Sequence, residues 1–235
     1  MFPAIRMSTV KLTSGRLVTA AFALAILGGC ASSAPPVKDQ AAPAQSALSG
    51  MLGRPLLVMP AQYLGVATPS GQMELSMMNR GLLGIMDEEL ADAFRKRGVR
   101  SSWTFAKEIT TAAMRQGGLV QDPRELSAES LRRIQASDSP LMEPLGTQIR
   151  QLVALQEGRY VLIPIEVDVD NRPGRGSGIL RVLLVDSRTA RVLWVDSIES
   201  PAPSDVPVED LLSGFGFRRL SRALATRFAD MVVAQ

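Results

Sequence analysis

The stretch Tyr160-Val161-Leu162-Ile163-Pro164-Ile165-Glu166-Val167-Asp168-Val169-Asp170 decides the fold of this 235-residue chain. It is apolar without interruption at its start and alternates strictly between apolar and acidic residues at its end. The first pattern is typical of a strand buried on both faces, and the second of a strand with one solvated face. We therefore predict a strand over residues 160–170 that runs from the core to a solvated edge. Pro164 has no backbone N–H to donate, which favours an edge position or a bulge there.

Two more strands are predicted directly after it, over residues 179–185 and 191–198. The residues between them, Asp186-Ser187-Arg188-Thr189-Ala190, have the composition of a turn, so the three strands form a meander. The alternation in Val192-Leu193-Trp194-Val195 indicates that Trp194 is a core residue, although it lies in a hairpin.

Upstream of the meander, a strand is predicted over residues 55–60, a short apolar run bounded by prolines. Residues 79–97 place apolar side chains near a 3.6-residue spacing, which predicts a helix that ends at Gly98. Residues 99–105 alternate in polarity and predict a second strand.

Further helices are predicted over residues 127–137, 145–156 and 211–233, and a short polar helix within residues 106–126. The apolar face of the last helix is expected to comprise Leu212, Phe215, Leu220, Leu224, Phe228 and Met231. Residues 51–235 contain no internal repeat and no second linker, so we expect one domain. The predicted fold class is α/β (α+β): a mixed, mainly antiparallel sheet with helices packed on it.

The amino-terminal residues 1–29 have the pattern of an export signal. Arg6, Lys11 and Arg16 precede an uncharged, mainly apolar run over residues 17–29. As a helix this run would reach about 20 Å, which is short of the roughly 30 Å hydrocarbon core of a bilayer. This length disfavours the alternative of an uncleaved anchor helix.

The run closes with Leu27-Gly28-Gly29-Cys30, which contains the one cysteine of the chain. An aliphatic residue, two small residues and a cysteine resemble the box of the bacterial lipoprotein signal. The resemblance implies cleavage before Cys30, diacylglycerol on its thiol and acyl chains such as palmitate that anchor the protein without spanning the membrane. The residue after the cysteine is Ala31 rather than Asp, which resembles the lipoproteins that are sorted to the outer membrane. The folded domain would then face the periplasm. The alternative is a chance cysteine at the end of an ordinary signal peptide.

Residues 30–50 are expected to be the lipidated cysteine and a linker, because residues 31–50 are rich in Ala, Ser, Pro and Gln and contain no aromatic residue. Loss of the leader with its three basic residues leaves as many acidic as basic residues in the mature chain. A neutral chain lacks the basic footprint that nucleic-acid binding needs, so no nucleic-acid partner is expected.

The order of elements, the strand entry Arg159-Tyr160-Val161-Leu162 and the hairpin over residues 183–194 resemble a recurring envelope domain. It is similar to the curli-secretion and penicillin-binding-protein-activator lipoproteins and to the amino-terminal domain of the Tol translocation protein. The resemblance implies helices on a mixed sheet and an assembly or accessory role with another envelope protein as partner, and no enzymatic activity.

The sequence offers few groups for catalysis. There is no histidine, and Cys30 is the one thiol, so the commonest general base and the usual zinc ligands are missing. Glu166, Asp168 and Asp170 are spaced by two and share one face of their strand, where they could bind a hard cation or act as an acid and base. A solvated face that keeps an edge soluble is the favoured interpretation. No cofactor is predicted.

Residues 171–178, Asn-Arg-Pro-Gly-Arg-Gly-Ser-Gly, predict an exposed, mobile hairpin loop. Arg172 and Arg175 would lie on its tip as possible partner contacts, or would simply aid solubility. Three hypotheses follow: a lipid-anchored, non-catalytic interaction module; a component of an oligomeric secretion channel; and a hydrolase that uses carboxylates alone. The first is favoured.

Overall fold

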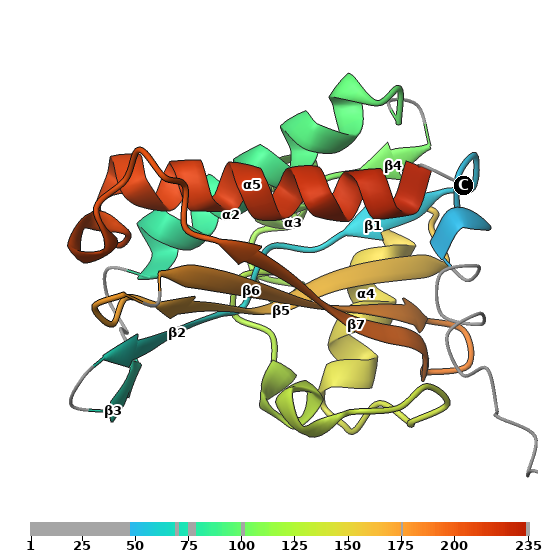
Figure 1. Cartoon of the computed structure of the whole chain (residues 1–235). Helices are drawn as coiled ribbons and strands as arrows, with labels where there is room; N and C mark the ends of the chain where they lie inside the picture. Colours follow the sequence, from blue (N-terminus) through green and yellow to red (C-terminus); the bar gives the residue numbers. More distant parts are fainter. Residues whose placement is uncertain (1–47, 69–70, 75–78, 100–101, 175, 234–235) are drawn as a thin grey trace, which may run out of the picture. The chain divides into compact units, whose positions relative to one another are not determined.

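The computed structural model describes residues 48–68, 71–74, 79–99, 102–174 and 176–233, all within the second of the chain's two units, Asp39–Gln235. Figure 1 shows the elements coloured along the sequence. The strands are β1 (Leu56–Val58), β2 (Tyr63–Thr68), β3 (Gly71–Glu74), β4 (Trp103–Thr104), β5 (Tyr160–Asp170), β6 (Ser177–Asp186) and β7 (Arg191–Pro201). The helices are α2 (Asn79–Lys96), α3 (Ala106–Met114), α4 (Leu145–Ala154) and α5 (Gly214–Val233), with short 3₁₀ helices η1 (Ala128–Arg133) and η2 (Val208–Asp210).

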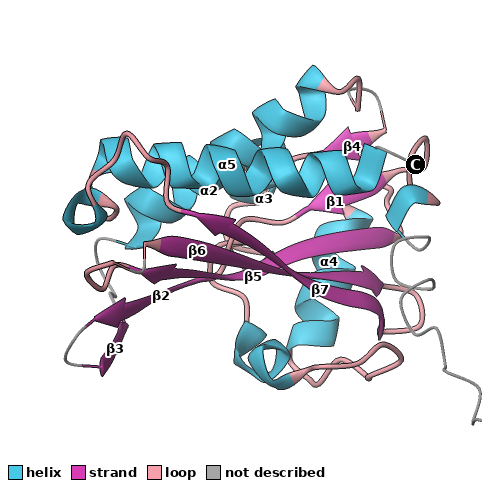
Figure 2. Cartoon of the chain, in the orientation of Figure 1, coloured by secondary structure: helices cyan, strands magenta, loops and turns pink. Residues whose placement is uncertain are grey.

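The seven strands form one mixed sheet organised around β5. One edge of β5 pairs antiparallel with β6 along its whole length, and β6 pairs antiparallel with β7. The other edge of β5 is shared, since β1 pairs with its first residues and β2 with its last, both in parallel. The strands β4 and β3 lie outside β1 and β2. Figure 2 shows this sheet with helices packed on it, which confirms the predicted fold class.

A register shift between Pro164 and Glu166 interrupts the pairing of β5 with β6. This is the bulge that the proline predicts. On the opposite edge, β1 ends and β2 begins at the same level, where the N–H of Gln62 donates to the carbonyl of Pro164 at 3.1 Å. The bulge therefore lies where the sheet passes from β1 to β2.

The two faces of the sheet carry separate hydrophobic clusters. Helices α2 and α5 cover one face, where Leu162, Leu184 and Trp194 are buried. Side chains of α3, η1 and α4 pack with the other face, where Val161 and Ile163 are buried. Neighbouring residues of β5 thus enter opposite clusters, as expected for a strand covered on both sides. None of the described helices combines the length and apolar character that crossing a membrane needs.

Several predicted elements differ from those observed. The hairpin of β2 and β3 was not predicted, because Gly65, Ala67 and Gly71 interrupt the apolar pattern. The predicted helix over residues 127–137 is only the short 3₁₀ helix η1. The strand predicted over residues 99–105 is reduced to the two residues of β4, and residues 100–101 lie outside the described ranges.

The carboxyl-terminal helix begins three residues later than predicted, after the turn η2. Leu220, Leu224 and Phe228 are fully buried, as predicted. Phe215 was wrongly assigned to the apolar face, since it is 66% exposed and Phe217 occupies the core. The reason is the helical spacing, because Phe215 lies five positions before Leu220 and about 140° around the helix from it, whereas Phe217 lies three positions before Leu220 and shares its face.

Trp194 of β7 is a core residue, as its alternation predicts. It is 3% exposed, and its ring stacks on that of Phe228 in α5 with ring centroids 6.4 Å apart and planes 6° apart. Phe228 in turn packs edge-on against Phe94 of α2. The chain of rings ties α2, α5 and the edge strand β7 together.

Replacement of Trp194 by Ala should lower the free energy of unfolding by about 3–5 kcal/mol, because it leaves a cavity beside Phe228. Denaturant unfolding of the purified protein measures this value. The neighbouring Leu193 points outward at 38% exposed, so Leu193→Ala serves as a control with a much smaller expected loss. Equal losses in the two variants would contradict the packing described.

Candidate functional site

The three acidic residues of β5 lie on the face of the sheet that η1 covers. The bulge at Pro164 brings this about, because after it Val167 and Val169 point to the α2 and α5 side and the acids point away from it. Glu166 is 7% exposed and forms an ion pair with Arg132 of η1. The interpretation of this row as a solvated face is therefore wrong for Glu166, because an arginine from a distant segment closes over it.

Two arginines cover the acids. The guanidinium of Arg132 lies 5.1 Å from the centre of the Tyr63 ring while it pairs with Glu166. Arg181, on β6 opposite Glu166, donates to the backbone carbonyls of Arg132 and Ile134. Arg181 thus holds the end of η1 against the sheet.

Asp168 is the most perturbed member of the row. Its side chain lies over Gly65 of β2, where the Cβ of any larger residue would collide with the Asp168 carboxylate. The Oδ1 atom is buried and has no hydrogen-bond partner among the described residues. Burial, and then the neighbouring charge of Glu166, raise the pKa of Asp168 from 3.8 to about 6, although Arg132 and Arg181 act in the opposite direction.

This cluster can hold a proton at Asp168, but its geometry does not suit an open reaction site. Glu166 is buried and paired with Arg132, so its carboxylate is not open to a substrate. Within the described ranges, no group of three potential ligands is placed to hold a metal ion. The burial of Glu166 therefore disfavours the carboxylate hydrolase hypothesis at this cluster.

The loop between β5 and β6 carries the predicted contact residues Arg172 and Arg175. Arg172 folds back onto Asp170, with Nε 2.8 Å from Oδ1 and Nη2 2.5 Å from Oδ2, and remains half-exposed. Arg175 lies outside the described residues. At the base of the loop a Cβ on Gly176 would come within 2.9 Å of Val208, so this glycine permits close packing against the segment before α5.

A groove of about 520 Å³ lies between α2 and α3, and the sequence did not indicate it. Asp87 lies in it at 7% exposure, accepting from the N–H of Ala61 at 2.8 Å and from Arg124 at 2.9 Å. Burial raises the pKa of Asp87 to about 6. Both carboxylate oxygens have partners, so Asp87 joins α2 to the segment after β1 and to the loop of Arg124.

Comparisons with known proteins give limited information. No family model and no curated protein matches this chain. Among solved structures, the chain is similar to the LpoB C-terminal domain from Escherichia coli, with 15% identity, a TM-score of 0.37, and coverage of 66% of this chain and 93% of that one. It is also similar to lipoprotein GNA1162 from Neisseria meningitidis, with 16% identity, a TM-score of 0.33, and coverage of 64% and 82%.

A third similar structure is the PelC dodecamer from Paraburkholderia phytofirmans, with 13% identity, a TM-score of 0.34, and coverage of 76% of this chain and 87% of that one. Likeness at these identities and scores assigns no function to this chain.

The raised pKa of Asp168 predicts a defined pH dependence of stability. The folded protein binds a proton at Asp168 below about pH 6, whereas the unfolded chain binds it only near the ordinary value of 3.8, so stability is lost as pH rises through 6. Asp168→Asn should raise the thermal midpoint at pH 7.5 by about 2–4 °C and raise it clearly less at pH 5, where Asp168 is still mostly protonated in the folded protein. This size corresponds to about 1 kcal/mol after allowance for partial exposure.

Thermal unfolding of both proteins at the two pH values measures the effect. Asp210→Asn in η2 is the matched control, since it makes the same chemical change at an exposed residue of a segment that is not part of the cluster of Glu166, Arg132 and Arg181. A gain for Asp168→Asn that is equal at both pH values would show that Asp168 does not titrate as described.

Proposed function

We propose that this chain is a lipid-anchored envelope protein whose folded domain is a non-catalytic interaction or assembly accessory module facing the periplasm. The observation that carries the proposal is Leu27-Gly28-Gly29-Cys30 at the end of a charged and then apolar leader. Acyl chains on Cys30 would hold the protein at the outer membrane, and two or more such chains bind durably.

The start of the described chain and the loop with Arg172 lie at opposite ends of the sheet. The described part begins at Leu48, which is buried, and the indole N–H of Trp103 in β4 donates to the carbonyl of Met51 at 3.3 Å. This is the end of the sheet where β1 and β5 start (Figure 1). The eleven residues of β5 then lead about 35 Å to the opposite end.

The loop with Arg172 lies at that opposite end, far from the chain entry (Figure 1). We propose that Arg172 and Arg175 contact an acidic patch on another envelope protein, since a guanidinium forms charge-assisted hydrogen bonds with carboxylates.

Replacement of Cys30 by Ser should abolish acylation, because a hydroxyl does not replace the thiol in thioether formation. Precursor or released soluble protein should accumulate in place of the membrane-bound form. Mass spectrometry of the amino terminus and fractionation of cells measure both effects, with Ser32→Ala as the control that keeps the thiol. A wild-type mature chain with an unmodified amino terminus elsewhere would disprove the anchor.

The double change Arg172→Ser and Arg175→Ser should keep the fold and remove crosslinks to the partner in intact envelopes. Thermal unfolding and crosslinking followed by mass spectrometry provide the two readouts. Arg188→Ser removes an exposed arginine from the β6–β7 hairpin at the other end of the sheet and is the control. Crosslinks that persist in the double variant, together with normal folding, would exclude the loop as the contact.

A further inference from the structure

A shallow hollow of about 340 Å³ lies between α5 and the chain that leaves β7. Three arginines line it: Arg219, Arg222 and Arg227. Ser200 and Thr226 add hydroxyl groups, and Pro203 and Ala223 complete the lining. No acidic residue is among these lining residues, so the hollow presents mainly hydrogen-bond donors.

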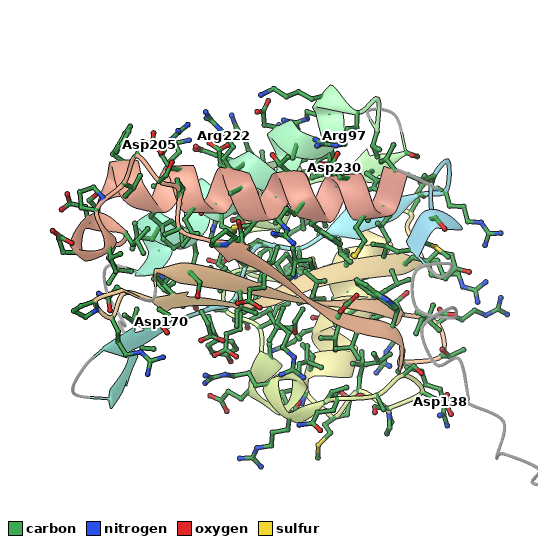
Figure 3. All side chains as sticks on the ribbon, viewed as in Figure 1. Arg97, Asp138, Asp170, Asp205, Arg222 and Asp230 are labelled. Carbon is green, nitrogen blue, oxygen red and sulfur yellow. The ribbon has the colours of Figure 1, made fainter. Side chains whose placement is uncertain are left out.

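The helical repeat brings the arginines together. Arg222 lies three positions after Arg219, and Arg227 lies eight positions after Arg219, so all three lie along one stripe of α5. Ala223 lies between them and its small side chain leaves space. Figure 3 labels Arg222 on the side of α5 that faces away from the sheet, with Asp205 near the start of the helix.

The arginines differ in how their donors are used. Arg222 is held by the buried Glu89 of α2, with Nε 2.9 Å from Oε2 and Nη2 3.1 Å from Oε1. Arg219 donates from Nη2 to Asp205 at 2.5 Å, but its Nε is buried and has no partner among the described residues. Arg227 is exposed.

The chain therefore orients two of the arginines, and Arg219 keeps one donor without an acceptor among the described residues. A charged N–H without an acceptor is unfavourable, so a ligand oxygen that bonds the Nε of Arg219 relieves a cost already present in the fold. Arg227, at the carboxyl-terminal end of the stripe, can then donate to the same acceptor.

We propose that this hollow binds a phosphate group. A phosphate presents three or four oxygens in a tetrahedron and can accept from several guanidinium groups and a hydroxyl at once. A carboxylate has only two oxygens, both in one plane, and two N–H groups of a single guanidinium can donate to both of them. The three arginines and the hydroxyl of Thr226 therefore fit phosphate better than carboxylate. This inference goes beyond the proposed function and does not depend on acylation.

The phosphate could come from an anionic lipid headgroup or from a soluble phosphate. The purified mature protein in a phosphate-free buffer is titrated with sodium phosphate at constant ionic strength, with the thermal midpoint and the Nε–H nitrogen resonances of the arginines as readouts. At about ten times the dissociation constant, the midpoint should rise by about 3–5 °C. The Arg219 and Arg227 resonances should shift.

The source of the phosphate is distinguished in lipid nanodiscs without added phosphate. If the headgroup is the ligand, the same resonances shift in discs of phosphatidylcholine with phosphatidylglycerol and not in discs of phosphatidylcholine alone. If soluble phosphate is the ligand, they shift only when sodium phosphate is added.

Arg227→Ala should weaken phosphate binding about tenfold or more, as expected for loss of a charged donor. Arg188→Ala, an exposed arginine on the β6–β7 hairpin, is the control with the same change of charge and should bind as wild type. Absence of any response to sodium phosphate would overturn the proposal. An equal response to sodium acetate, or an equal loss in Arg188→Ala, would also overturn it.

Discussion

The pairing of β5 with three other strands is the constraint on which the rest of the structure depends. One edge of β5 is used throughout by β6, whereas the other is shared between β1 and β2. At the junction between β1 and β2 the carbonyl of Pro164 accepts from the N–H of Gln62. Pro164 has no N–H of its own, so no donor is left without a partner there, and the shared edge is continuous. The register shift at the same level redirects the following side chains, so it sets which residues of β5 enter each hydrophobic cluster.

The same shift explains the buried acids. It directs Glu166 and Asp168 to the face that η1 covers, where Arg132 and Arg181 lie. Taking carboxylates out of water is costly, and a buried ion pair often only offsets that cost. The perturbed Asp168 shows that the offset is incomplete there, because burial outweighs both arginines in setting its pKa. We attribute the cluster to the positioning of η1 on the sheet rather than to net stability.

The sequence predicts the elements whose pattern is local and long. Residues 160–170 and α2 are examples, because alternation or helical spacing extends over ten residues or more. The hairpin of β2 and β3 was not predicted, because the glycine at position 65 weakens the strand pattern. That glycine leaves space for the side chain of Asp168, which belongs to a distant segment of the chain. The burial of Glu166 and the groove at Asp87 likewise depend on arginines far along the chain, so no local pattern reveals them. The anchor at Cys30 remains a prediction.

The packing of α2 on α5 links stability to the chemistry of the outer surface. Glu89 of α2 is almost fully buried and is neutralised by Arg218 and Arg222 of α5, and Arg97 joins Asp230 at the far end of the helix pair (Figure 3). Removal of Glu89 would therefore loosen α2 and release Arg222 together. An arginine fixed in this way has already lost its side-chain entropy on folding, so a ligand that meets it has less entropy to lose. The ion pairs that align the two helices thus also pre-organise the donors on the exposed stripe of α5.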